Sequence, residues 1–198
     1  NGILDNGNNN FCINGVGNNY TLTAKNFPAS FDCGYAWIGD GTSTFCNSDL
    51  TVEHTYLVDN ITSCSTNGLN INANNVALDC AGFAIQGITD RGIEIDQYVN
   101  NSVITNCLIM GNFDMGVFTD EPSVNISIIN NSISGSSYGI YLDSNLSLIE
   151  NNSFINSTIS GIGVVSSSNI IYNNYFNSSG NDLAFIENNE GNLVSNNL

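Results

Sequence analysis

A short motif that recurs at nearly constant spacing limits what this chain can fold into more than any other feature. The motif is Gly, an apolar residue, any residue and a second apolar residue, and its degenerate last copy is DLAF at Asp182. Successive copies begin 24, 24, 23, 22 and 21 residues apart. The five regular copies are GLNI at Gly68, GIEI at Gly92, GVFT at Gly116, GIYL at Gly139 and GIGV at Gly161.

A second motif keeps step with the first. It places one apolar residue three positions before an Asn and another two positions after it. Its copies are Val103/Asn106/Leu108, Ile128/Asn131/Ile133, Ile149/Asn152/Phe154, Ile171/Asn174/Phe176 and a partial Val194/Asn197; Leu78/Ala81/Phe83 opens the series without the Asn. Two motifs in one register indicate a repeat architecture.

The period identifies the repeating unit. About 22 residues is too short for a helix pair, which takes more than 30. Apolar and polar residues alternate within the motif, as in strands, and Asn, Ser and Gly between the motifs favour turns. Each repeat is therefore predicted to be a coil of short strands, and stacked coils bury apolar columns. The two expected columns are Leu69, Ile93, Val117, Ile140, Ile162 and Leu183, and Leu78, Val103, Ile128, Ile149, Ile171 and Val194.

The stretch NGLNINANNVALDCAGFAIQG (67–87) and the units that follow it resemble the right-handed parallel β-helix repeat. This superfamily includes pectate lyases, polygalacturonases and many archaeal and bacterial surface proteins. The resemblance covers roughly residues 56–198 and implies an all-β, single-stranded right-handed β-helix of about six coils. In the family, an Asn at one turn stacks as a ladder inside the coil, where buried amides satisfy one another. The matching positions here are Asn106, Asn131, Asn152, Asn174 and Asn197.

The first third of the chain does not show the repeat. The open end of a β-solenoid needs covering, because unpaired strand edges invite association. We therefore expect residues 1–66 to form an N-terminal cap or small β-rich domain, and residues 67–198 to form the β-helix.

The six cysteines predict a disulfide framework. An even number in a secreted chain favours three disulfides, although six cysteines allow 15 pairings and partly free, buried thiols are the alternative. Cys80 and Cys107 lie near the same turn of adjacent coils and could join them. The start at Asn1 without a signal peptide fits a processed secreted protein, although a trimmed chain would look the same. The cysteines are Cys12, Cys33, Cys46, Cys64, Cys80 and Cys107.

N-glycosylation sequons are slightly more frequent than composition predicts, and outward turns would leave them accessible. The candidates are Asn19, Asn60, Asn100, Asn125, Asn130, Asn145, Asn151, Asn156 and Asn177.

One outward position carries a carboxylate on three consecutive coils. The repeat register places Asp96, Asp120 and Asp143 there, about 4.8 Å apart along the axis. A solvated acidic stripe is one interpretation. A Ca²⁺ ion, which prefers carboxylate oxygens, is the other, with Glu94 and Glu121 close enough to assist. No cofactor is otherwise required.

Beside this stripe the register places Phe118 and Tyr141 as exposed neighbours, an arrangement that resembles a sugar platform. Lyases of the superfamily typically use an Arg or Lys base, and only Arg91 lies near. A chain with 18 acidic and two basic residues also repels a polyuronate. No catalytic residues are assigned, and a carbohydrate-binding or carbohydrate-active β-helix is the alternative function.

Composition excludes several classes of protein. The net charge of −16 with two cations argues against nucleic-acid partners, which need several Lys or Arg. No apolar run is long enough to span a bilayer. His54, the single histidine, has no catalytic partner at a recognisable spacing.

The predicted function is a secreted or cell-surface structural solenoid. The repeat runs into LVSNNL (193–198) and stops part-way through a coil, with Val194 and Asn197 still in register. We expect that open end to bind the N-terminal region of another copy, and head-to-tail contacts propagate as filaments. Copies of the chain are therefore the expected partners, with glycans as further candidates.

Overall fold

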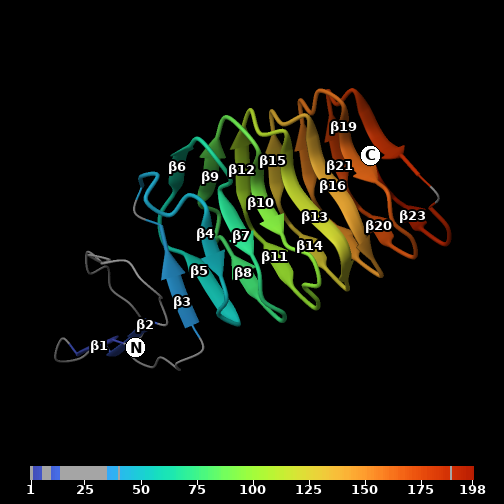
Figure 1. Cartoon of the computed structure of the whole chain (residues 1–198). Helices are drawn as coiled ribbons and strands as arrows, with labels where there is room; N and C mark the ends of the chain where they lie inside the picture. The colour runs from blue at the N-terminus through green and yellow to red at the C-terminus, as the bar shows by residue number, and fades with distance from the viewer. Residues whose placement is uncertain (1, 6–9, 14–34, 40, 188) are drawn as a thin grey trace.

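The computed structural model describes residues 2–5, 10–13, 35–39, 41–187 and 189–198, and no helix occurs among them. Three parallel sheets wrap into a solenoid of about six coils, which confirms the predicted fold (Figure 1). Outside the solenoid, β1 (Gly2–Asp5) and β2 (Asn10–Ile13) pair in antiparallel fashion.

The solenoid sheets are named B, C and D. Sheet B contains β3 (Tyr35–Ile38), β5 (His54–Leu57), β8 (Ala77–Asp79), β11 (Val103–Thr105), β14 (Ser127–Ile129), β17 (Leu148–Glu150), β20 (Ile170–Tyr172) and β23 (Leu193–Ser195). Sheet C contains β4 (Ser48–Leu50), β7 (Leu69–Ile71), β10 (Arg91–Ile95), β13 (Met115–Val124), β16 (Tyr138–Asn145), β19 (Ser160–Val164) and β22 (Asn181–Phe185). Sheet D contains β6 (Ile61–Cys64), β9 (Ala84–Gly87), β12 (Leu108–Gly111), β15 (Ser132–Ser134), β18 (Ser153–Ile155) and β21 (Tyr175–Asn177).

The chain passes through sheets C, B and D in turn within each regular coil, as β7, β8 and β9 do. The solenoid begins before residue 67. Strands β4, β5 and β6 pair in parallel with β7, β8 and β9. Residues 35–66, which the sequence analysis assigned to the cap, therefore already contribute strands to sheets B, C and D. Residues 14–34 of the expected cap lie outside the described residues.

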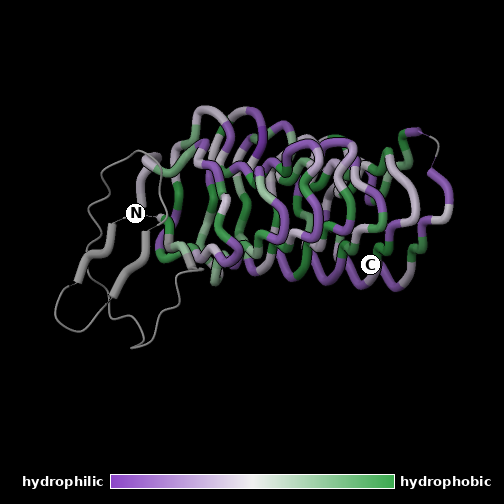
Figure 2. The backbone as a smooth tube through the Cα atoms, turned by 60° about the horizontal axis from the view of Figure 1, so that its bottom comes forward, coloured by the Kyte–Doolittle hydropathy of each residue, from purple (hydrophilic) through white to green (hydrophobic). Residues whose placement is uncertain are grey.

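The core consists of apolar columns along the solenoid axis. Figure 2 shows hydrophobic and hydrophilic segments alternating coil after coil. The column expected in sheet C is in register throughout, from Leu69 to Leu183. In sheet B one member was wrong. Ile104, not Val103, points inward and is fully buried between Leu78 and Ile128. Val103 and Ile104 are both apolar, so the alternation of apolar and polar residues did not decide which of them points inward.

The same one-residue error affected the ladder. Asn106 is exposed at φ 56°, and the next residue, Cys107, occupies the buried position. Later coils carry an Asn-Asn pair with divided roles. The first Asn adopts positive φ, which Asn tolerates better than most residues. The second enters the ladder. The turn residues are Asn130, Asn151, Asn173 and Asn196, and the ladder residues are Asn131, Asn152, Asn174 and Asn197.

Each ladder amide is satisfied by its neighbours along the axis. The side chain of Asn152 donates to Ile128 O at 2.8 Å and to Asn174 Oδ1 at 3.1 Å. Its own Oδ1 accepts the backbone N–H of Asn131 at 2.9 Å. A second internal column, which the sequence analysis missed, lies at the turns from sheet C to sheet B. There Ser147 Oγ accepts Ile126 N–H, and Asn169 Oδ1 accepts Ser147 N–H at 2.8 Å.

The glycine that opens each repeat is required by close packing of the coils. A Cβ built on Gly92 would lie 2.5 Å from Gly116 O and 2.6 Å from Ile109 Cγ2. Any side chain there would push neighbouring coils apart.

Candidate functional site on the outer face of sheet C

The expected outward row of sheet C is in register. Each member lies directly beside the next across neighbouring parallel strands. The row runs Asn70, Glu94, Phe118, Tyr141, Gly163 and Ala184. Sequence spacing therefore placed this surface correctly.

The interpretation of Phe118 as an exposed platform was wrong. Phe118 is only 8% exposed, because the Arg91 guanidinium lies 3.9 Å above its ring centroid. Arg91 also forms an ion pair with Glu94, which in turn accepts a hydrogen bond from Asn67. One cation thus satisfies a carboxylate and covers an aromatic face. Arg91 is the first residue of β10.

Tyr141 is the accessible aromatic side chain of the row, and it is half-buried. Tyr138 packs against it edge to face at 5.3 Å, and Phe118 lies 5.9 Å away. Gly163 leaves room for the Tyr138 ring, which a Cβ at that position would approach to 2.9 Å. Burial, followed by the charge of Asp143, raises the pKa of Tyr141. Sequence analysis did not single out Tyr138.

Carboxylates gather where β13 departs from regular pairing. The register shifts between Thr119 and Ser123, so three residues face one on β16, and the Glu121–Pro122 peptide is cis. Bulges of this kind often lie beside functional sites. Burial, followed by the charges of Glu121, Asp120 and Glu187, raises the pKa of Asp143.

The structure therefore brings Asp120 and Asp143 together with Glu121, as the repeat register implied. It adds Glu187, which sequence analysis missed because Glu187 lies outside the motif. Within the described residues, no group of three or more His, Cys, Asp or Glu side chains converges closely enough to hold a metal ion. Binding of Ca²⁺ to Asp96, Asp120 and Asp143 stays a prediction.

Residues 116–198 match the family model described as a right handed beta helix region. This part of the chain is a right-handed β-helix. The earlier coils continue the same three parallel sheets without a break. Comparisons with curated proteins and with solved structures gave no match.

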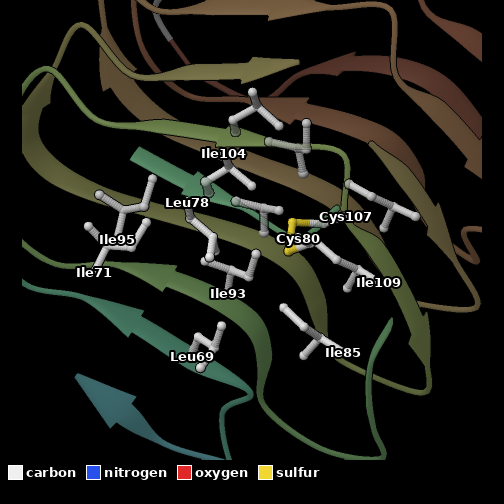
Figure 3. Packing of buried hydrophobic residues seen from close by; sticks show 14 of the residues in the cluster. Leu69, Ile71, Leu78, Cys80, Ile85, Ile93, Ile95, Ile104, Cys107 and Ile109 are labelled. Carbon is white, nitrogen blue, oxygen red and sulfur yellow. A yellow bond between two sulfur atoms is a disulfide. The ribbon is translucent and has the colours of Figure 1, made fainter. Parts of the chain in front are cut away.

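Two disulfides join coils of the β-helix. Cys46 pairs with Cys64, and Cys80 pairs with Cys107, which confirms disulfides among these four cysteines. Figure 3 shows the second disulfide within the apolar core near Leu78 and Ile109. Disulfides of this kind indicate an oxidising environment. The third expected pair would involve Cys12 and Cys33, whose side chains lie outside the described part of the structure.

The sequons of the β-helix fall into two groups, and Asn19 lies outside the described residues. Five are exposed: Asn125, Asn130, Asn151, Asn156 and Asn177. Three are half-buried, and their Oδ1 atoms accept backbone N–H groups from the next coil: Asn60, Asn100 and Asn145. Glycosylation of any of them stays a prediction, and the exposed group has the space for it.

The exposed turn asparagines also line a shallow depression of about 540 Å³ beside Leu108 and Ser132. The longer turn at residues 80–83 forms one of its walls. Its lining carries no ionisable side chain. Sequons Asn130 and Asn151 lie in it, so a glycan on either residue would occupy it.

No helix in the described residues is long and apolar enough to cross a membrane.

Proposed function

We propose that this β-helix is a non-enzymatic structural unit of an extracellular assembly, joined end to end with copies of itself into a filament or envelope layer. The observation that carries the proposal is the difference between the two ends of the described solenoid. One end exposes the interior of a coil, and the other does not.

Among the described residues, no further coil stacks on the last strands of the solenoid. Strands β21, β22 and β23 are the outermost strands of their sheets. Among the described strands, none lies beside the outer edges of β22 and β23, whereas Leu198 O accepts the Phe176 N–H of β21 at 2.7 Å. Val194 is 39% exposed although Ile171 and Ile149, in the same inward column, are fully buried. Leu198 is 84% exposed and Phe185 52% exposed. Unpaired strand edges beside exposed apolar side chains favour association.

The opposite end of the described solenoid differs. Its inward apolar side chains are buried, with exposures of 9% for Ile38, 5% for Phe45 and 4% for Leu50. Since the two ends are unlike, a contact between them is heterologous, and heterologous contacts propagate into filaments unless they close into a ring. The disulfides support a location in an oxidising, extracellular compartment.

The test places a charge on the open interior of the end coil. Val194→Asp is compared with Asn177→Asp, which adds the same charge to the outer side of that coil. We expect the wild type and Asn177→Asp to form end-to-end assemblies that grow with protein concentration. Val194→Asp should not form them. Sedimentation velocity and electron microscopy report the products, and circular dichroism verifies the fold. A wild type that stays monomeric at high concentration would overturn the proposal.

A second candidate function is binding of neutral glycans, favoured by Tyr141 with its flanking Tyr138 and Asp143. Arg91 is engaged by Glu94 and Phe118, so binding is favoured over lyase chemistry. Calorimetric titration with neutral oligosaccharides tests this candidate. We expect Tyr141→Ala to lose binding at least tenfold, and Tyr175→Ala, on the outer face of sheet D, to retain it.

A further inference from the structure

The outer face of sheet B carries an apolar stripe along the solenoid axis. Side chains at the first position of each strand lie in register, as Leu148, Ile170 and Leu193 do on consecutive strands. Val103 occupies the same row two coils earlier, and Ile129 lies in the neighbouring outward row. The sheet-B stripe is defined as Val103, Ile129, Leu148, Ile170 and Leu193.

The stripe is open to solvent. Ile170 is 44% exposed and Leu193 59% exposed, and the other three are half-buried. Parallel sheets usually have both faces covered. The strands of sheet B run along the lower side of the solenoid in Figure 1, with β2 near the β3 end of the sheet, away from the stripe. Leu193 lies on β23 next to Val194, which is also exposed.

The stripe itself contains no charged residue. The outward rows of sheet B from β8 to β23 contain two carboxylates, Asp79 and Glu150. Asp79 accepts hydrogen bonds from Ala81 N–H and from Asn106 Nδ2. Glu150 accepts hydrogen bonds from the Tyr172 hydroxyl and from Asn151 Nδ2.

The other two faces differ from this one. Sheet C and its border carry clustered carboxylates, among them Asp120, Glu121 and Asp143. The strands of sheet D are uncharged, but the centre of their outer face is polar, with Ser132, Ser134 and Ser153. From β8 to β23, sheet B therefore combines exposed apolar area with only two outward carboxylates.

We propose that two copies of this chain pack side by side through the sheet-B stripe, each presenting the same surface to the other. A partner that carries the same net charge of −16 is repelled most by the acidic face of sheet C and less by a face with only two carboxylates. Two sheets that pack face to face lie about 10 Å apart, which suits interdigitating Leu and Ile side chains.

The size of the stripe sets its strength. Five strands spaced about 4.8 Å apart span roughly 20 Å, and two outward rows are about 10 Å wide. The resulting area of roughly 200 Å² per copy is far below the roughly 800 Å² per partner of a standard interface. Single copies therefore pair weakly. Where many copies are aligned, as in the end-to-end filament proposed above, the contacts act together and filaments pair laterally. The lateral pairing of filaments rests on the proposed end-to-end assembly, whereas the weak pairing of single copies does not depend on it.

The test uses two isoleucines of matched exposure. Ile170 lies in the stripe and is 44% exposed, whereas Ile159 lies in a turn between sheets D and C and is 45% exposed. We expect Ile170→Glu to weaken dimerisation at least tenfold in sedimentation equilibrium and to leave filaments single in electron micrographs. Ile159→Glu adds the same charge and should behave as the wild type. Because Glu lowers strand propensity, Ile170→Thr, which remains β-branched, serves as a second variant.

The outcomes separate this inference from the proposed function. Val194→Asp should abolish filaments but retain the weak dimer of single copies. The inference is overturned if Ile170→Glu still dimerises and bundles, or if Ile159→Glu loses pairing equally. Wild-type filaments that never pair would overturn it while leaving end-to-end assembly intact. If the wild type forms no filaments but forms dimers that Ile170→Glu weakens, the side-by-side pairing is supported and the end-to-end assembly is overturned.

Discussion

At the scale of single residues, two adjacent asparagines have different structural roles: the first forms the turn and the second joins the buried ladder. Asn151 is exposed and adopts φ 54°, whereas Asn152 is 1% exposed and joins amides of three successive coils. The role depends on whether the side chain points outward or inward, and a shift of one residue in the assigned register exchanges the two directions. The Asn-Asn pairs were visible in the sequence. They would have marked the second Asn as the buried one, because positive φ suits the first.

This division of roles gives a matched prediction. Asn151→Gly should change the free energy of unfolding little, because glycine adopts positive φ readily. Asn152→Gly should cost about 2–3 kcal/mol more than Asn151→Gly, because it leaves Asn131 N–H and Ile128 O without partners. Both variants lose the same side chain, so effects on the unfolded chain cancel. Urea denaturation measures the difference, and equal losses would contradict the ladder role.

A second residue-scale prediction concerns Asp143. Because its folded pKa is raised above the usual 3.8, ionised Asp143 destabilises the fold at neutral pH. That penalty fades as pH falls through the folded pKa toward the unfolded value. Asp143→Asn should therefore raise Tm at pH 7, and the gain should shrink toward roughly pH 4.

The matched control is Asp114→Asn, which removes one exposed charge elsewhere. Measurement with chelator present keeps any bound cation from masking the effect. A shift in Tm that is the same for both variants at every pH would show that only net charge matters.

At the scale of strands and turns, the sequence was most informative where repeats were regular. The turns from sheet B to sheet D take two residues in the later coils but four at residues 80–83. The longer turn contains Ala81 and Gly82 at positive φ. There the chain substitutes a disulfide for the ladder, with Cys107 in the ladder position. Spacing alone could not reveal this substitution, because apolar residues fill the motif's flanking positions in both registers and Asn106 favoured the wrong one.

The replacement of the ladder asparagine by a disulfide can be reversed in part by mutation. The Cys80–Cys107 disulfide closes a loop with a sequence separation of 27. Loss of such a cross-link is expected to cost about 3.5 kcal/mol on chain-entropy grounds. Cys80→Ala/Cys107→Ala should show this loss in urea denaturation. Cys80→Ala/Cys107→Asn should recover part of it, because the new amide can donate to Asn131 Oδ1. No recovery would mean that this coil cannot accommodate a ladder residue.

At the scale of the whole molecule, the repeat predicted the β-helix and the outward row of sheet C. It missed Glu187, Tyr138 and the covering of Phe118 by Arg91, because these contacts join residues at different positions of the repeat. The repeat register predicts which residues point inward and which point outward. It does not predict which outward side chains cover their neighbours, as Arg91 covers Phe118. The exposure of the end coil likewise follows from the stack as a whole, since each coil of a solenoid is stabilised mainly by its neighbours.

That dependence predicts a gradient of local stability, measurable by amide hydrogen exchange. Strands β22 and β23 have a neighbouring strand on one side only, so their amides should exchange fastest. Strands β13 to β17 have coils on both sides, and their amides should exchange only on global opening. If copies stack end to end, raising the protein concentration should slow exchange in the end coil and leave the central coils unchanged. With Val194→Asp the concentration dependence should disappear while the gradient remains. Uniform exchange along the chain would show that the solenoid opens as one unit, and a gradient insensitive to concentration would count against end-to-end contacts.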